Sequence, residues 1–282
     1  MEEENLMNDK VVRPLFKNSK VGKKLVSRII SEVLEVDYED IYNNIELLND
    51  DMIFSSKARD GRTDVMLETN KYYINIEICY SKGTTRERQM DSYIYSIFFK
   101  EAIKSDKLQN MKNIIQIMLE NYDYFHKNKF CYKVIPMESE LHIPDDPFIV
   151  RYHFNLALIR KMKYTSIRNE KDALKKILYM FVCQNEDLEK AYMGDKFMEE
   201  VVKIAREISG REKIPLFLSE DEIRRLDREE AVQEGYAAGK TEMIVNLFNN
   251  GVSIDLISKS SNLSVEEVKK IINSSDKIVN NN

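Results

Sequence analysis

Two acidic residues, Asp64 and Glu77, lie in apolar stretches of the segment GRTDVMLETNKYYINIEICY at positions 61–80. A carboxylate in so apolar a strand loses hydration, and this cost has to be compensated. A second carboxylate and a divalent metal ion would compensate it, and hard oxygen ligands of this kind support phosphodiester hydrolysis with Mg²⁺. An edge strand whose acids face water explains the same pattern. The spacing alone leaves both interpretations open.

The segment that carries the two acids has the pattern of a β-hairpin. Polar residues at positions 68–71 supply the turn between two apolar runs. In the second run the side chains alternate between two faces. The isoleucines Ile74, Ile76 and Ile78 share one face, and the other face carries Tyr73, Asn75, Glu77 and Cys79. Asp64 and Glu77 could therefore meet across the hairpin.

The elements around the hairpin predict an α/β fold. Apolar residues spaced by about 3.6 predict a helix over residues 21–36, and residues 45–54 have the pattern of an interrupted strand. After the hairpin, Thr84 and Thr85 can cap a helix that runs to Ile103. The apolar run at 113–119 predicts a buried strand. The order helix, three strands, helix, strand indicates a mixed sheet flanked by helices.

The rest of the chain changes from strand-rich to helical. Residues 129–159 contain further strand patterns, whereas the ranges 171–184, 186–209 and 220–250 are helical. Two short helices are expected at the end, the second with a capping box formed by Ser264 and Glu267. Such a helix-turn-helix unit is compatible with DNA binding and equally with dimerisation or capping. The predicted organisation is a core at 1–165, a helical region at 166–250 and a two-helix tail at 251–282.

Composition excludes several classes of protein. With 43% hydrophobic and 10% aromatic residues among 282, the chain can bury a large core and is not disordered. Three scattered cysteines indicate neither a disulfide framework nor a zinc site, and no apolar run could span a bilayer. We therefore expect a cytoplasmic protein without membrane contact.

The charge pattern limits how the chain could bind nucleic acid. Its net charge of −5 means that any contact with DNA must come from local basic patches. One patch consists of Arg86 and Arg88 after the hairpin, although a solvated helix face is the simpler explanation for each patch taken singly. A second patch is N-terminal and contains Lys10, Arg13, Lys17, Lys20, Lys23, Lys24 and Arg28.

The order of elements, with Asp64 and the stretch Ile76-Glu77-Ile78, resembles the PD-(D/E)XK nuclease superfamily. Within it the chain is most similar to the Rpn-type recombination-promoting nucleases, also described as PD-(D/E)XK family transposases. Residues 9–17 are similar to the N-terminal motif of that family, and residues 263–268 to its C-terminus. The resemblance covers most of the chain through short motifs. It implies a restriction-endonuclease-like mixed sheet followed by an all-α C-terminal region.

The resemblance also implies roles for individual residues. Asp64 and Glu77 would bind Mg²⁺ or Mn²⁺, and Glu32 on the first helix would be a third acid or a solvated helix residue. The stretch from Gln89 to Tyr93 resembles a Q-x-x-x-Y motif near DNA, where core packing is the alternative for Tyr93. With Arg86 and Arg88, these side chains would contact DNA.

Cys79 departs from the pattern of the superfamily. The superfamily has lysine at this position and the Rpn type usually glutamine, whereas a neutral thiol donates hydrogen bonds poorly and carries no positive charge. Two functions follow. One is a metal-dependent DNA endonuclease linked to recombination or mobile elements, in which Cys79 faces the scissile phosphate. The other is a catalytically degenerate protein that binds DNA or forms homo-oligomers through its helical tail.

Overall fold

The computed structural model describes residues 6–18, 20–48, 65–80, 86–104, 110–145 and 148–279. Within these ranges, the side chains of residues 86–90, 104, 227, 230, 231, 233, 234, 237, 238 and 274–279 are not described. The chain divides into two compact units, Met1–Glu220 and Asp221–Asn282. The predicted boundary after residue 165 falls inside the first unit, because helices from both sides of it pack together there.

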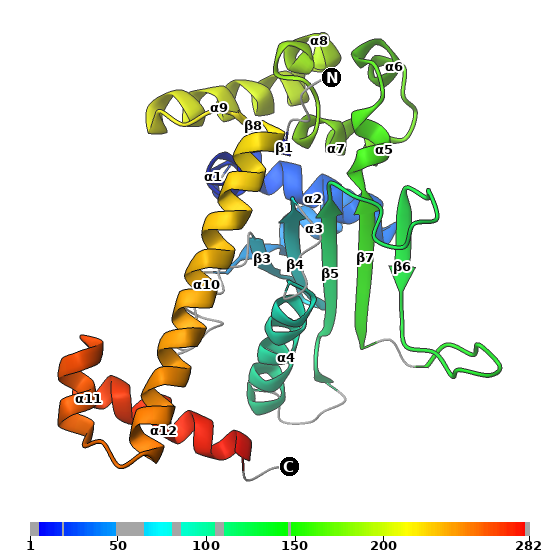
Figure 1. The fold of residues 1–282 in the computed structure, drawn as a ribbon. Helices are drawn as coiled ribbons and strands as arrows, with labels where there is room; N and C mark the ends of the chain where they lie inside the picture. The colour runs from blue at the N-terminus through cyan, green and yellow to red at the C-terminus, as the bar shows by residue number, and fades with distance from the viewer. Residues whose placement is uncertain are drawn as a thin grey trace. The chain divides into compact units, whose positions relative to one another are not determined.

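A mixed six-stranded sheet forms the centre of the first unit, with strand order β2-β3-β4-β5-β7-β6 (Figure 1). Strands β4, β5 and β7 run parallel, whereas β2 and β3 at one edge and β6 at the other pair antiparallel. The strands are β2 (Glu46–Leu47), β3 (Val65–Glu68), β4 (Tyr72–Cys79), β5 (Asn113–Glu120), β6 (Cys131–Val134) and β7 (Ile149–Asn155). The predicted hairpin, β3–β4, and the buried strand β5 are confirmed.

The two faces of β4 are those that alternation predicts. Ile74, Ile76 and Ile78 are at most 1% exposed on one face. On the other face, Asn75 stands opposite Met66 of β3 and Gln116 of β5. Both faces of the strand are therefore buried, as expected for a parallel strand covered by helices on both sides.

Helices cover both faces of this sheet. Helix α4 (Arg86–Lys104) connects β4 to β5 and lies in front of the sheet in Figure 1, whereas α2 (Val21–Leu34) lies behind it. From α4, Ile94 and Ile97 pack against Met66, Tyr73 and Ile114 of the sheet. The fold is thus α/β, with a mixed sheet between helices.

The N-terminal helices α1 (Asp9–Lys17), α2 and α3 (Tyr38–Asn44) pack closely together. A glycine is required where α1 meets α2, because a methyl group at Gly22 would lie 2.3 Å from the carbonyl oxygen of Phe16. Helix α2 buries the stripe that its apolar period predicts, namely Leu25, Val26, Ile29, Ile30 and Val33. The predicted first helix is therefore confirmed.

The first unit ends in a group of short helices and one longer helix. These elements are α5 (Leu156–Arg160), α6 (Tyr164–Arg168), α7 (Ala173–Leu178), α8 (Leu188–Tyr192) and α9 (Lys196–Glu212), with 3₁₀ turns at Tyr179–Phe181 and Asn185–Asp187. Strand β8 (Phe217–Leu218) then pairs antiparallel with β1 (Leu6–Met7). The sequence does not indicate this pairing, because two-residue strands have no readable period.

The second unit is helical and consists of α10 (Glu220–Asn249), α11 (Ile254–Ser261) and α12 (Val265–Val279). Its core contains Ile244, Ile257, Val268 and Ile272. The predicted capping box is present, since Glu267 N donates to Ser264 Oγ over 3.2 Å and Ser264 N donates to Glu267 Oε2 over 2.7 Å. The predicted pair of terminal helices is confirmed. No helix in the described ranges is long and apolar enough to cross a membrane.

Candidate active site

Glu77 lies within β4 and is 3% exposed. The side-chain amide of Asn75, two residues earlier on the same face, donates to Glu77 Oε1 over 2.8 Å. This hydrogen bond compensates part of the cost of burying a carboxylate. The predicted site residue is therefore on the side of the sheet that α4 covers.

A row of polar side chains continues from Asn75 across the sheet. The strand register places Asn75, Gln116 and Arg151 next to one another on β4, β5 and β7. Gln116 Nε2 donates to Asn75 Oδ1 over 3.1 Å, and Arg151 Nε donates to Gln116 Oε1 over 2.5 Å. Arg151 Nη2 also donates to Asp91 of α4 over 2.5 Å. Hydrogen bonds thus connect the buried Glu77 to a partly exposed guanidinium group.

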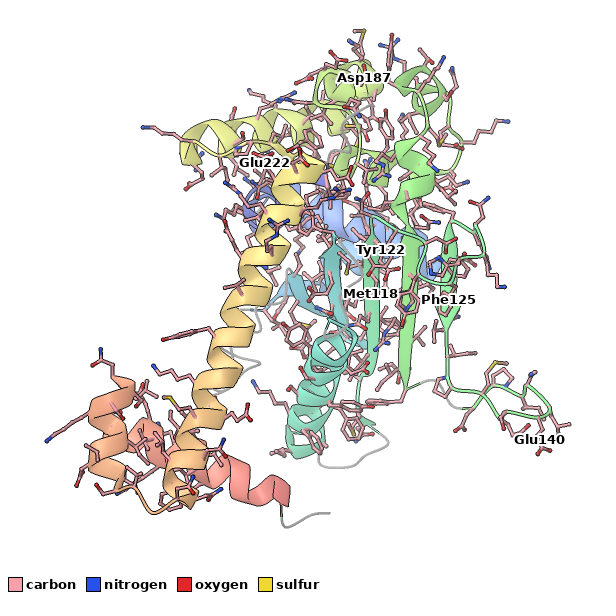
Figure 2. The ribbon with its side chains drawn as sticks, in the orientation of Figure 1. Met118, Tyr122, Phe125, Glu140, Asp187 and Glu222 are labelled. Atoms are coloured by element: carbon pink, nitrogen blue, oxygen red, sulfur yellow. The ribbon has the colours of Figure 1, made fainter. Side chains whose placement is uncertain are left out.

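Cys79 lies at the end of β4 and is fully buried. It packs with Tyr93 of α4 and Met118 of β5, and Tyr122 covers this cluster (Figure 2). Cys79 thus lies between side chains of α4 and β5 and not in solvent. Tyr93 is 3% exposed, which agrees with the core-packing alternative for this residue.

Several predicted site residues lie outside the described part of the structure. Asp64 is not among the described residues, and β3 begins at Val65 opposite Ile76. Arg86, Arg88 and Gln89 belong to the first turns of α4, but their side chains are not described.

Glu32 is described and is exposed on α2. It is absent from the buried stripe of that helix, as a solvated helix residue would be. The structure thus brings Glu77, Cys79 and Tyr93 to one side of the sheet, and it leaves Glu32 in contact with solvent.

A second buried pair on the same sheet face escaped the sequence interpretation. His153 Nδ1 lies 3.0 and 3.1 Å from the two carboxylate oxygens of Glu120, and both residues are at most 4% exposed. Two aromatic rings surround the imidazole of His153. The centroid of the Tyr124 ring lies 4.4 Å from the imidazole centroid, and that of the Phe125 ring lies 5.4 Å from it. Gln116 and Glu120 are four positions apart within an apolar run, and residues an even number of positions apart share one face of a strand. This spacing is the only signal in the sequence that indicates a polar face on β5.

The donor chemistry around Glu77 fits a hard divalent cation only in part. A carboxylate suits Mg²⁺, but the Cys79 thiol does not, because sulfur ligands select softer metals. Across the described residues, no three His, Cys, Asp or Glu side chains come close enough to hold a metal ion. A complete metal site would therefore require Asp64 as well as Glu77.

No family model, no curated protein and no solved structure matches the chain.

Proposed function

We propose that the protein is a metal-dependent DNA endonuclease of the Rpn-like PD-(D/E)XK type, linked to recombination or mobile elements. The observation that carries the proposal is the position of Glu77. It is a buried carboxylate on the second strand of the β3–β4 hairpin, in a chain whose elements follow the order helix, three strands, helix, strand. The resemblance implies a carboxylate at such a position in a restriction-endonuclease-like core, and this agreement supports the proposal.

The roles of the individual side chains follow from this proposal. Asp64 and Glu77 would hold Mg²⁺ or Mn²⁺, which would supply an activated water and neutralise phosphate charge. Glu32, the third acid of the resemblance, is exposed on α2 and is left out of this set. Asn75 orients the Glu77 carboxylate through its 2.8 Å hydrogen bond. The resemblance implies that the Cys79 position faces the scissile phosphate, although in this structure its side chain is fully buried against Tyr93 and Met118.

DNA contacts in this proposal come from α4. Arg86 and Arg88 bind the phosphate backbone. Such contacts fix the position of the protein on DNA but do not read the base sequence. Gln89 supplies a polar contact beside them. Tyr93 acts indirectly, because its ring packs on Cys79 and so shapes the floor of the site.

Plasmid nicking tests the proposal directly. Purified protein with Mg²⁺ or Mn²⁺ should convert supercoiled plasmid to the open circular form, and Asp64→Ala and Glu77→Gln should each abolish this conversion. Glu77→Gln keeps an acceptor for Asn75 at nearly the same volume, which preserves the fold. The matched control is Glu46→Gln, an exposed carboxylate on β2 of the same sheet, and it should nick plasmid like the wild type. Wild-type protein that shifts plasmid on a gel but never nicks it would exclude the enzyme.

Metal binding gives an independent measurement. Calorimetric titration with Mn²⁺ should show one site in the wild type and none in Asp64→Ala or Glu77→Gln. Loss of binding in both variants would place the two carboxylates in one site. If both variants still bind Mn²⁺, neither carboxylate is a ligand of the bound ion.

A second candidate function rests on Cys79, which is fully buried and lies against Tyr93 and Met118. A catalytically degenerate protein that binds DNA or self-associates would tolerate such a residue, because it needs no positively charged side chain at position 79. Cys79→Gln and Cys79→Lys distinguish the two candidates. Cleavage that appears only in these variants would show an otherwise intact site that lacks one group, and absence of cleavage together with DNA binding would favour the degenerate protein.

A further inference from the structure

A basic pocket of about 560 Å³ lies in the first unit, where residues of α2, α6 and α7 meet the start of α9. Its charged lining consists of four cations and one carboxylate: Arg28, Arg168, Lys176, Lys196 and Asp195. This lining carries an excess of three positive charges in a chain whose net charge is −5. Such a local excess is a feature that the overall composition does not predict.

Aromatic rings hold one of these cations in place. The guanidinium carbon of Arg28 lies 3.9 Å from the centroid of the Phe197 ring and 6.0 Å from that of Tyr38. A stacked guanidinium keeps its N–H donors in its own plane, where they can form two parallel bonds to an oxyanion. Arg28 is therefore oriented before any ligand arrives.

The other cations are only partly used within the protein. Lys176 Nζ lies 3.1 Å from Asp195 Oδ2, and Arg168 donates Nε to the carbonyl of Lys190 over 2.9 Å. Among the residues that the structure describes, Arg28, Arg168 and Lys196 form no ion pair. Their charges are thus available to a ligand.

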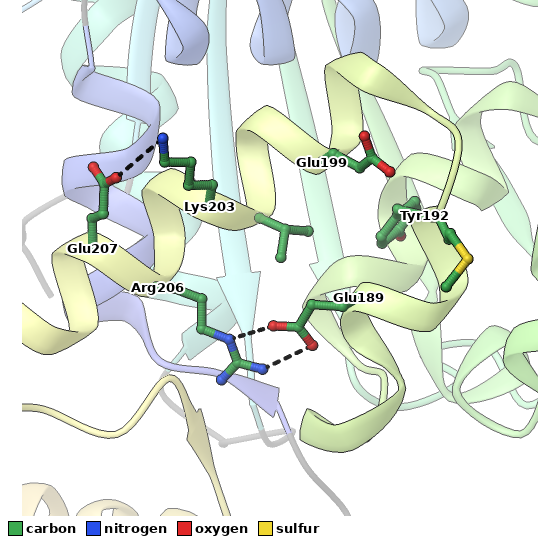
Figure 3. Close-up of a pocket in the computed structure, with 8 residues that line it drawn as sticks. Glu189, Tyr192, Glu199, Lys203, Arg206 and Glu207 are labelled. Carbon is green, nitrogen blue, oxygen red and sulfur yellow. Dashed lines mark hydrogen bonds and ion pairs between the residues drawn. The ribbon is translucent and has the colours of Figure 1, made fainter.

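The neighbouring pocket between α8 and α9 shows the opposite arrangement (Figure 3). There, Arg206 donates to both carboxylate oxygens of Glu189 over 2.8 and 3.2 Å, and Lys203 lies 3.9 Å from Glu207. Each cation in that pocket already has a carboxylate partner. The two pockets differ in charge balance, although they are of similar size and share the side chain of Met193.

The start of α9 adds to the positive potential of the basic pocket. Asp195 caps this 17-residue helix by accepting a hydrogen bond from Met198 N over 3.1 Å. Burial acts to raise the pKa of Asp195, but the bonds from Met198 and Lys176 outweigh it, so the pKa lies below its ordinary value. The single carboxylate of the pocket is therefore charged at neutral pH, and it neutralises only part of the cationic lining.

We infer that this pocket binds a phosphate group, with Arg28 and Lys196 as its principal contacts. Phosphate has oxygen acceptors in several directions and carries about −1.5 to −2 charges at neutral pH, which matches convergent cations better than a single carboxylate would. The volume of the pocket exceeds that of the ion, so it accommodates a phosphate attached to a larger molecule. Free phosphate and the terminal 5′-phosphate of a nucleic acid share this chemistry, whereas a backbone phosphodiester offers similar oxygen acceptors with a single negative charge.

Calorimetric titration of the full-length protein with inorganic phosphate tests the inference. The buffer contains EDTA, so the result is independent of the proposed metal site and of cleavage. Wild-type protein should bind phosphate at one site. Arg28→Gln and Lys196→Gln should each weaken binding about tenfold or more, because each removes a charge-assisted hydrogen bond. Both side chains are exposed, so neither change should unfold the protein.

Two further variants make the test specific. Asp195→Asn should tighten phosphate binding, since asparagine still caps α9 while the only carboxylate of the pocket loses its charge. Lys203→Gln, in the neighbouring pocket, removes one positive charge from the same helix and should leave binding unchanged. The inference is overturned if wild-type protein does not bind phosphate, or if Arg28→Gln and Lys203→Gln bind it equally well.

A DNA oligonucleotide with and without a 5′-phosphate then identifies the source of the group. Tighter binding of the 5′-phosphorylated strand, lost in Arg28→Gln, would assign the pocket to a DNA end. Equal binding of both strands, weakened in Arg28→Gln, would assign it to the DNA backbone. Binding of inorganic phosphate alone would assign it to a free phosphate ligand. Each of these three results supports a phosphate site and identifies the molecule that carries the phosphate.

Discussion

The two faces of the central sheet are equally buried but differ in chemistry. On one face, Ile74, Ile76 and Ile78 of β4 exclude water, with apolar neighbours on β5. On the face under α4, the same strands carry the row from Asn75 to Arg151 and the pair Glu120–His153. Burial on the first face needs no specific partner. On the second, hydrogen bonds within the row and within the pair offset the cost of burying these polar groups.

This difference shows where the sheet can carry chemistry. An apolar face contributes to stability in proportion to the area that it buries, but it has no polar or charged groups that could bind or activate a substrate. The polar face maintains Glu77 in a defined orientation at the expense of stability, which is typical of functional sites. Four substitutions test the comparison, in order of decreasing expected effect.

The largest effect should come from His153→Leu. This change leaves the Glu120 carboxylate buried without its partner, and we expect the free energy of unfolding to fall by about 3–5 kcal/mol. In the double variant with Glu120→Leu, part of the loss should be recovered, because the whole pair is replaced by apolar groups. Urea denaturation followed by circular dichroism measures both. Losses that simply add would contradict the coupling between these residues.

On the apolar face, Ile76→Ala should cost about 2–5 kcal/mol, because it opens a cavity in a fully buried position. The smaller change Ile76→Val should cost about 0.5–1.5 kcal/mol. The same denaturation experiment applies. The comparison fails if the loss does not grow with the volume removed.

A change within the polar row should have a moderate effect. Gln116→Leu removes the donor to Asn75 and the acceptor of Arg151, and it should cost about 1–3 kcal/mol because buried polar atoms lose their partners. In the proposed enzyme it should also reduce nicking, since Asn75 no longer holds Glu77 through a fixed amide. The exposed variant Glu46→Gln serves as control and should change stability by less than about 0.5 kcal/mol. Unchanged stability of Gln116→Leu would show that the row is not structurally important.

The smallest effect is expected at the edge of the same face. Tyr73→Phe loses the 3.0 Å hydrogen bond to Glu101 and should cost about 0.5–1.5 kcal/mol. Burial and this bond raise the pKa of Tyr73 well above its ordinary value of 10.0. The neutral phenol is thus favoured in the folded state, so its contribution is complete below pH 10.0 and is lost as the pH rises above it. A difference between wild type and Tyr73→Phe that changes between neutral pH and pH 9 would contradict this pKa shift.

Most local structure could be predicted from local patterns. The alternation in β4, the apolar stripe of α2 and the capping box of Ser264 each depend on residues that are neighbours along the chain. Such patterns are readable because side-chain direction repeats with a fixed period. The burial of Glu77 does not follow from them, because an edge strand whose acids face water has the same spacing.

Contacts between distant segments were decided only in the tertiary structure. Asn75, Gln116 and Arg151 meet because of the register between three strands, and a shift by one residue would turn every side chain to the opposite face. Likewise, Arg28 and Lys196 line one pocket although they are far apart in sequence. The sequence by itself determined the longer elements, the apolar faces of β4 and α2, and the candidate carboxylate Glu77. Packing between elements decided which groups surround that carboxylate, because long-range register and helix docking leave no periodic signal in the chain.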